Sequence, residues 1–461
     1  MRRIGRQAET PARAMVKMAF TGALLGGGAL LGGMAQAQSG PRNVQRRPAI
    51  LNEPTVTLRV NTGSAGVQAN GPSDVAAVSH DGRFVVYSST ATNLVPGDAA
   101  GIRDVFLFDA MTKLTSIVSV DPAGQPGNGA SGTSLALSSD GRFVAFDSWA
   151  DDLVAGDTNG QLDIFVRDVF LGTTERVSVD SNGVQANAAS AGVTMSDDGR
   201  FVAFSSWATN LIGTDANDQQ DIFLHDRLTG ETRRLTETIT GVGGEGTSHS
   251  PQISSDGRFV AYSSRANNLV DEPLSIYHYI FVHDTLSGET WHASKNTFGE
   301  HAHDHSNTRP DVTPDGRFVV FGSNAYNLAF PDLNFASDVF LHDRDTGETT
   351  RISEGWLGQE GNGGSILPSI SDDGRFITFI SSASNLVPGD VNGEDDVFLY
   401  DRVLGTMSCI SGDALGGASN GPSRTVTLSA DGQHMLFVSE ATDLVFGDTN
   451  RQPDVFLHPV R

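Results

Sequence analysis

Histidines between positions 249 and 305 offer the clearest metal-binding chemistry in this 461-residue chain. His301, His303 and His305 alternate, so in an extended segment their rings lie on the same side of the chain. Imidazoles beside a carboxylate, here Asp304, are typical ligands of zinc, manganese or copper. The pattern predicts one transition-metal site formed by His249, His301, His303 and His305, with a solvated polar loop as the alternative.

A recurring acidic loop offers a second kind of metal chemistry. Its spacing is Asp-x-Asn-x-x-x-Asp, and oxygens at the first and third positions resemble the start of a calcium-binding loop. The later bidentate glutamate of such a loop is missing, so the alternative is an Asx-turn that satisfies its own backbone. The predicted calcium ligands are Asp157, Asn159, Asp163, Asp215, Asn217, Asp221, Asp390, Asn392 and Asp396.

A third group of residues could bind an organic ligand. Tyr277, His278 and Tyr279 interrupt one copy of the acidic loop, and with His301 and His303 they could contact a sugar or a peptide. A second recurring segment reads Gly-x-x-x-Asn-x-x-Ser, and its amides could bind the same ligand. The alternative for this segment is turn capping that recurs with the repeat. The predicted amide ligands are Asn187, Asn362 and Asn420.

A sequence repeat positions all of these residues. Its marker is a turn reading Asp-Gly-Arg-Phe, and successive copies lie 58 or 59 residues apart, which leaves no room for an inserted domain. The copies begin at Asp81, Asp140, Asp198, Asp256, Asp315 and Asp373, with a seventh at Asp431 that reads Asp-Gly-Gln-His.

Each repeat predicts four short strands. In the second copy, apolar runs at 134–138 and 143–146 flank the Asp-Gly hairpin turn, and further strands follow at 164–166 and 174–179. One such sheet is marginal alone, so seven sheets are expected to stack around an axis. The predicted fold is therefore all-β: a seven-bladed β-propeller of four-stranded antiparallel blades.

The two ends of the repeat array predict how the ring closes. The seventh copy stops after its third strand, and the missing fourth strand matches 57–60 near the N-terminus. The N-terminal strand is therefore predicted to complete the last blade and to remove exposed strand edges. Strand parity places the acidic loops and the connections between blades on one rim, where His249, His278, His301, His303 and His305 are expected. The tight turns fall on the other rim.

The N-terminal region predicts an export signal. Five basic residues up to Lys17 precede an apolar, Gly-rich run at 18–34, and Ala35-Gln36-Ala37 supplies a cleavage site. We predict a signal peptide at 1–37, a flexible lead-in at 38–52 and the propeller at 53–461, with a periplasmic or secreted destination. An uncleaved membrane anchor is the alternative for the apolar run.

Charge and cysteine content limit the possible partners. The formal net charge is −24, and removal of 1–37 takes away five basic residues and one acidic residue, which gives −28. Such a surface repels nucleic acids and anionic membranes, so neither a nucleic-acid partner nor stable membrane insertion after cleavage is expected. The single cysteine, Cys409, is expected to be a buried, inert thiol in the fourth strand of the sixth blade.

The repeat resembles the TolB-like β-propeller family over about residues 54–461. The resemblance rests on Ser196–Phe204, which read Ser-Asp-Asp-Gly-Arg-Phe-Val-Ala-Phe, and on Asp221–Asp226, which read Asp-Ile-Phe-Leu-His-Asp. It implies an exported, non-enzymatic scaffold that binds a protein, peptide or glycan. Neither a Gly-x-Ser-x-Gly elbow nor a phosphate-binding glycine motif is present.

Two other functions are compatible with the same residues. One is a metal-dependent lyase or hydrolase acting on a polysaccharide, similar to propeller lyases that hold a divalent metal with histidines. The other is a surface protein stabilised by calcium in the acidic loops.

Overall fold

The computed structural model describes residues 57–63, 66–98, 101–213, 215, 217–238, 240–306 and 308–460. In this part of the chain, strands β1 to β28 form seven four-stranded antiparallel sheets, and no α-helix occurs. Accordingly, none of the described segments is a helix that could cross a membrane. The predicted signal peptide and lead-in lie outside the described residues.

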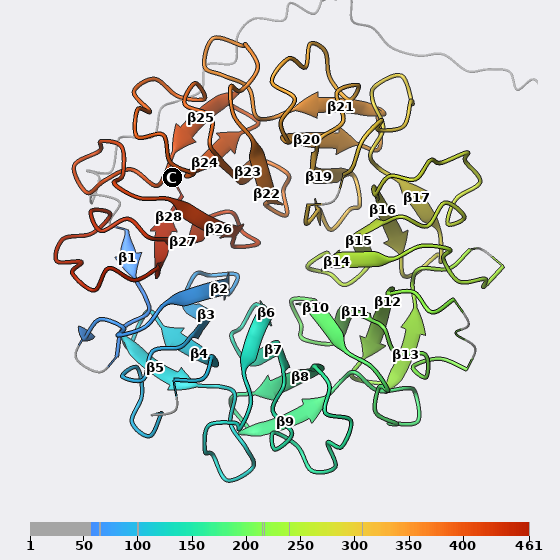
Figure 1. Cartoon of the computed structure of the whole chain (residues 1–461), viewed down its shortest axis with the longest axis vertical. Helices are drawn as coiled ribbons and strands as arrows, with labels where there is room; N and C mark the ends of the chain where they lie inside the picture. Colours follow the sequence, from blue (N-terminus) through green and yellow to red (C-terminus); the bar gives the residue numbers. More distant parts are fainter. Residues whose placement is uncertain are drawn as a thin grey trace, which may run out of the picture. The chain divides into compact units, whose positions relative to one another are not determined.

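The first four blades follow one another along the chain (Figure 1). Blade one is β2 (Ser73–Val78), β3 (Phe84–Ser89), β4 (Asp104–Asp109) and β5 (Leu114–Ile117). Blade two is β6 (Ser131–Leu137), β7 (Phe143–Ser148), β8 (Asp163–Asp168) and β9 (Thr173–Arg176). Blade three is β10 (Ser190–Met195), β11 (Phe201–Ser206), β12 (Asp221–Asp226) and β13 (Glu231–Arg234). Blade four is β14 (Ser248–Ile253), β15 (Phe259–Ser264), β16 (Tyr279–Asp284) and β17 (Thr290–His292).

The last three blades complete the ring. Blade five is β18 (Asp311–Val312), β19 (Phe318–Ser323), β20 (Asp338–Asp343) and β21 (Glu348–Arg351). Blade six is β22 (Ser365–Ile370), β23 (Phe376–Ser381), β24 (Asp396–Asp401) and β25 (Thr406–Cys409). Blade seven is β26 (Ser423–Leu428), β27 (His434–Ser439), β28 (Asp454–Pro459) and β1 (Leu58–Arg59). The predicted seven-bladed propeller is confirmed.

The N-terminal strand closes the ring as predicted. Leu58 and Arg59 of β1 pair with Leu457 and Phe456 of β28, and the backbone N–H of Val60 donates to the carbonyl of Val455 at 2.9 Å. One blade is therefore built from both ends of the described chain, next to β2 in Figure 1.

The second and third strands of each blade hold its core. An aromatic residue on each second strand stacks on a phenylalanine of the third strand, with ring centroids 5.6–6.0 Å apart in all seven blades. These side chains alternate with residues that face the neighbouring blade, so each sheet buries apolar groups on both faces. The first strand of each blade lies nearest the centre and the fourth lies outermost (Figure 1).

In six of the seven blades, the Asp-Gly-Arg-Phe turn connects two strands of its own blade and also contacts the neighbouring blade. In blade two, the Arg142 guanidinium pairs with Asp168 at the end of β8 and lies 4.7 Å above the Phe143 ring. Gly141 has a positive φ of 74°, and a Cβ there would come within 2.2 Å of the Phe84 ring of blade one. Glycine is therefore required both by the turn and by the packing between blades.

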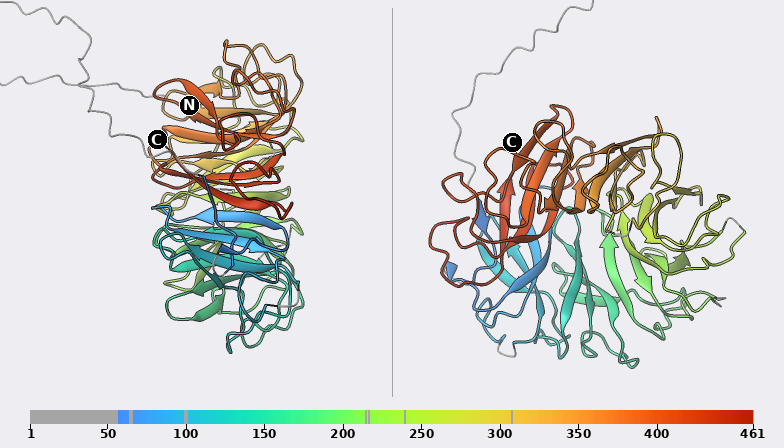
Figure 2. Two further views of the ribbon diagram at one scale, coloured as in Figure 1. Left: turned by 90° about the vertical axis from the view of Figure 1, so that its left-hand side faces the viewer. Right: turned by 45° about the horizontal axis from the view of Figure 1, so that its top comes forward.

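The strands run across the thickness of the ring, so their ends define two rims (Figure 2). The loop after each second strand and the connection between blades share one side, which we call the loop-bearing rim. The short turns that follow the first and third strands lie on the opposite rim. All of the residues predicted to bind a ligand or a metal belong to the loop-bearing rim.

Candidate functional site

In four blades an arginine from the fourth strand lies inside the acidic loop. Arg176 of blade two lies 3.2 Å from Asp157 and 3.8 Å from Asp163, and its side chain is mostly buried. The register is shared, because Arg176 pairs with Phe165 just as Arg234 pairs with Phe223. The other arginines at this position are Arg234 in blade three, Arg351 in blade five and Arg59 in blade seven.

The second aspartate of these loops also has other protein partners. Asn159 donates to Asp163 Oδ2 at 2.8 Å, and Ser178 donates to Asp163 Oδ1 at 2.6 Å. In blade three, Asn217 and Thr236 make the same contacts with Asp221. A guanidinium therefore stands where the predicted calcium ion would neutralise Asp157, Asp163, Asp215 and Asp221.

Blade six keeps the acidic loop but lacks the arginine. The residue that pairs with Phe398, at the position of Arg176, is Cys409. Asn392 donates to Asp396 Oδ2 at 2.8 Å, as in the other blades. Burial raises the pKa of the Cys409 thiol to about 12, and the neighbouring Asp396 adds to this shift, so the thiol stays protonated.

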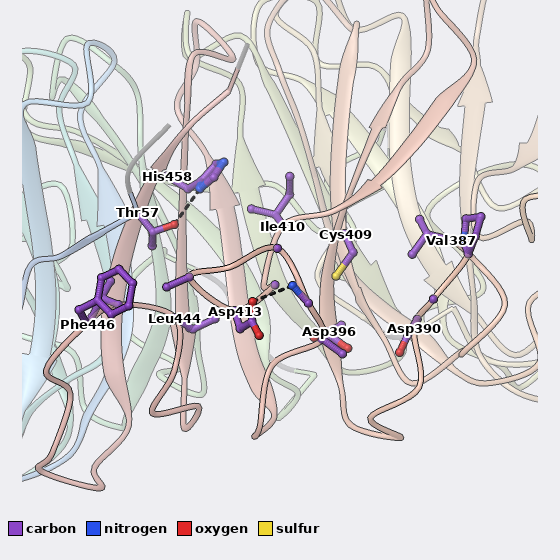
Figure 3. Close-up of a pocket in the computed structure, with 18 residues that line it drawn as sticks. Thr57, Val387, Asp390, Asp396, Cys409, Ile410, Asp413, Leu444, Phe446 and His458 are labelled. Carbon is purple, nitrogen blue, oxygen red and sulfur yellow. Dashed lines mark hydrogen bonds between the residues drawn. The ribbon is translucent and has the colours of Figure 1, made fainter. Parts of the chain in front are cut away.

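A pocket of about 690 Å³ opens at this place, between blades six and seven, and we call it the blade-six pocket (Figure 3). Its lining includes the Asp390 and Asp396 carboxylates, Cys409 and the apolar side chains of Ile410 and Phe446. Burial raises the pKa of Asp390, and the nearby Asp396 contributes to this shift. The pocket thus combines apolar walls with two carboxylates that no arginine of the described residues neutralises.

Large apolar side chains occupy exposed loop tips around this pocket. Val391, Leu415 and Phe446 are 83%, 86% and 84% exposed. The corresponding positions of blade two hold Thr158, Asn182 and Ala155. Further exposed apolar tips occur on the same rim in the loops around blade five, at Phe298, Phe330, Leu333, Phe335, Trp356 and Leu357.

Blade four replaces the acidic loop and its arginine with a different set of residues. The residue that pairs with Phe281, at the arginine position, is His292, and Tyr279 replaces the second aspartate. Glu272 Oε2 lies 3.3 Å from His292 Nδ1 and 3.6 Å from His301 Nδ1, and its Oε1 accepts from Lys295 Nζ at 2.6 Å. We call Glu272, His292 and His301 the blade-four cluster.

Charges in the blade-four cluster are set by burial and pairing. The hydrogen bond from His292 and the Lys295 ammonium lower the pKa of Glu272 to about 2, so its carboxylate is ionised near neutral pH. Burial lowers the pKa of His292 to about 4 and also lowers that of His301. Both imidazoles are therefore neutral near pH 7, which is the form that binds metals.

Glu272 and His292 were not among the predicted site residues. The histidine could have been found by aligning the fourth strands of the repeat, where Arg59, Arg176, Arg234 and Arg351 share one position with His292. Glu272 had a weaker signal, since it lies one residue earlier than the first aspartate of the regular loop.

A separate histidine group lies closer to the centre of the ring. The His249 and His278 rings are 4.9 Å apart, the His278 and His305 rings are 5.3 Å apart, and Tyr277 meets His305 edge to face. His305 Nδ1 accepts from the backbone N–H of His278 at 3.0 Å. Burial and the neighbouring histidines lower the pKa of His278 to about 4.

The four histidines predicted to share one metal ion are therefore divided among three places. His249 and His305 lie with His278, whereas His301 lies with Glu272. His303 contacts Tyr326, with His303 Nδ1 and Tyr326 Oη 3.3 Å apart. Among the described residues, no three of the four predicted ligands bring their donor atoms within 4.8 Å of one another.

The predicted amide ligands hold the connections between blades. Asn187 donates from Nδ2 to Thr209 Oγ1 and accepts from the backbone N–H of Thr209, both at 2.9 Å. Asn362 and Asn420 make equivalent contacts with Ser384 and Thr442. These contacts match the turn-capping alternative, and they leave each amide one N–H for a ligand.

Comparisons with known proteins give a fold but few sequence matches. No protein-family model matches the chain. Dipeptidyl-peptidase 5 from Porphyromonas endodontalis is 31% identical over 70 residues, which are 15% of this chain and 9% of that protein. The chain thus matches less than a tenth of that relative's length.

Several solved structures are similar to this chain. TolB from Acinetobacter baumannii has 14% identity and a TM-score of 0.40, with 78% of this chain and 76% of that chain covered. An oligogalacturonate lyase in complex with manganese has 13% identity and a TM-score of 0.50, with 88% of this chain and 97% of that chain covered. At these identities the likeness concerns the fold.

Proposed function

We propose that this chain is an exported binding scaffold that holds a protein or peptide on its loop-bearing rim. The observation that carries the proposal is the blade-six pocket, whose lining includes the exposed Phe446 and residues next in sequence to the exposed tips Val391 and Leu415. Exposed apolar groups that gather around a pocket are typical of interaction sites. The TolB-like resemblance supports a binding role and an exported destination.

The pocket also favours a particular kind of side chain in the partner. In four other blades the same loop contacts an arginine from the fourth strand of its own blade, whereas in blade six Asp390 and Asp396 face a space beside Cys409. A basic side chain inserted there would pair with the carboxylates, and neighbouring apolar residues would cover the tips. We therefore expect a ligand peptide with one arginine or lysine flanked by apolar residues.

Selection from a random peptide library on the wild-type protein tests this proposal. The enriched peptides should carry that pattern, and their affinity should fall at least tenfold for a Val391→Ser and Phe446→Ser double variant. The matched control is Leu171→Ser with Leu228→Ser, which changes comparably exposed side chains in turns of the opposite rim. Equal affinity of the selected peptides for both double variants would refute the assignment to this rim.

The part of the loop-bearing rim formed by blades four and five, which we call the blade-four face, could extend the binding surface toward a glycan. Tyr277, His303 and Tyr326 offer rings on this face that could stack on a sugar. Binding of neutral oligosaccharides that is lost in His303→Ala with Tyr326→Ala, while peptide binding remains, would identify a glycan as the ligand of this face.

A metal-dependent enzyme acting on an acidic polysaccharide is the second candidate function. It is favoured by the fold shared with the manganese-bound oligogalacturonate lyase and by the His249, His278 and His305 group. The net charge of −24 opposes an anionic substrate. To test for this activity, the protein is incubated with oligogalacturonate and manganese, and unsaturated products are measured. The activity should be lost in His278→Ala.

A further inference from the structure

We propose that Glu272, His292 and His301 bind one divalent transition-metal ion of the zinc class. This site differs from the four-histidine site expected from the sequence, since only His301 is common to both. It is independent of the peptide-binding proposal, because blade six and its pocket contribute no residue to it.

The distances in the cluster match those of a metal site. Glu272 Oε2 lies 3.3 Å from His292 Nδ1 and 3.6 Å from His301 Nδ1. Two ligands that each lie 2.0–2.1 Å from a tetrahedral zinc ion are roughly 3.3–3.4 Å apart. The donor atoms of all three residues lie within 4.8 Å of one another, so small side-chain movements would complete the geometry.

Neighbouring residues hold each ligand in position. His292 Nε2 lies 2.9 Å from Ser294 Oγ, which also accepts from the backbone N–H of Ile280. In the metal-bound state the proton of His292 would lie on Nε2 and be donated to Ser294 Oγ, which would free Nδ1 to bind the metal, as in metal sites whose histidines are oriented by a second partner. Lys295 occupies Glu272 Oε1, so Oε2 is the oxygen that faces both imidazoles.

His301 supplies an atom without a partner. Its Nδ1 is buried and has no hydrogen-bond partner among the described residues. Its backbone is fixed, because its carbonyl accepts from Asn327 Nδ2 at 2.8 Å and it forms a β-bridge with Lys295. A bound cation would satisfy this nitrogen and would neutralise Glu272 together with Lys295.

In blade five, a positively charged side chain of the protein occupies the place that corresponds to the proposed metal ion. There Asp332, Asp338 and Glu360 form a comparable three-residue group, and Arg351 Nη1 lies 3.1 Å from Asp338 and 2.7 Å from Glu360. Blade four has no arginine at this position and offers two imidazole nitrogens instead. The donor set thus changes from one suited to a guanidinium to one suited to zinc.

Zinc titration of the chelator-treated chain, purified without a metal column, tests the proposal. We expect one saturable Zn²⁺ per chain by calorimetry and a higher melting temperature with Zn²⁺, because a metal that binds only the folded state stabilises it. His301→Ala and Glu272→Gln should each weaken binding at least tenfold. Glu360→Gln in blade five and His303→Ala are the matched controls and should bind Zn²⁺ as the wild type does.

A second measurement separates loss of the site from loss of the fold. The variants should keep the denaturation midpoint of the metal-free wild type, and Co²⁺ bound in place of zinc should show the visible spectrum of a four-coordinate site only when all three residues are intact. Absence of saturable Zn²⁺ binding by the wild type would overturn the proposal. Binding that survives both His301→Ala and Glu272→Gln would equally overturn it.

Discussion

Arg234 illustrates how single residues stabilise the blades of this ring. Its side chain is 4% exposed, and it lies 3.2 Å from Asp215 and 3.5 Å from Asp221, which are also buried. Replacing one partner of a buried ion pair leaves the other charge without compensation. The arginine therefore matters more for stability than its pairing energy alone suggests.

Arg234→Met should lower the free energy of unfolding by about 3–5 kcal/mol. Urea denaturation monitored by fluorescence gives this quantity. Arg424→Met is the control, because Arg424 pairs with Glu440 on the exposed surface, and such pairs contribute at most about 1 kcal/mol. Similar losses for both variants would show that burial of Arg234 does not determine its contribution.

His283 is a second single residue with a testable effect: it predicts that the folding stability depends on pH. Burial, and next the nearby Arg233, lower the pKa of this histidine to about 4 from 6.5. The unfolded chain therefore binds more protons than the folded chain between these values, and stability falls as the pH drops through that window. The contribution of His283 is fully present above pH 6.5.

His283→Gln should accordingly lose less stability than the wild type on acidification. The difference between the two proteins should amount to roughly 2 kcal/mol between pH 7 and pH 5. Denaturant midpoints at the two pH values measure it. Buried carboxylates act in the opposite sense, since burial raises the pKa of Asp197 to about 6. Their effect is the same in both proteins and cancels in the comparison. Parallel pH profiles would contradict the prediction.

At the scale of elements, β1 is a short strand with a large structural role. Beyond its two paired residues, the buried Asn61 donates to Asp454 Oδ1 at 2.6 Å and accepts from the backbone N–H of Val455 at 3.1 Å. In five of the other six blades a serine or threonine makes both contacts, for example Ser178 with Asp163 and Ile164. In blade four, where Tyr279 replaces the aspartate, Ser294 makes the backbone contact with Ile280. Asn61 therefore joins the last blade to the first part of the described chain.

Asn61→Ala should destabilise the ring by about 1–3 kcal/mol, because it leaves buried polar groups of β28 without partners. Asn61→Ser should retain most of the stability, since serine serves at this position in other blades. Thermal melting of the three proteins compares them. An alanine variant as stable as the serine variant would show that closure depends on the backbone pairing of β1 alone.

At the scale of the whole molecule, the filled acidic loops predict that calcium contributes little to stability. Four of the loops already contain a guanidinium. Chelation or millimolar calcium should therefore leave the melting temperature nearly unchanged, as measured by calorimetry. Any small rise with calcium should decrease in Asp390→Asn, because the acidic loop of blade six is one of those without an arginine. A rise of several degrees that persists in this variant would support the calcium hypothesis.

The sequence alone determined the architecture of this protein. Turn chemistry and strand alternation are local properties, and their recurrence along the chain predicted the number of blades, the rims and the closure by residues 57–60. It also placed His301 and His303 on the loop-bearing rim. It did not determine which residues contact one another on this rim, because the contacts join loop residues to fourth-strand residues that lie far from them along the chain.

Only the tertiary structure decided the contents of the sites. Register places Arg176 against the acidic loop of its own blade, and it brings His292 at the same position to Glu272 and His301. The structure also separates His249 and His305 from His301, although the sequence places His305 only four residues away. The physical reason is that a turn between blades directs neighbouring residues toward different strands, whereas strand pairing joins residues far apart in the chain.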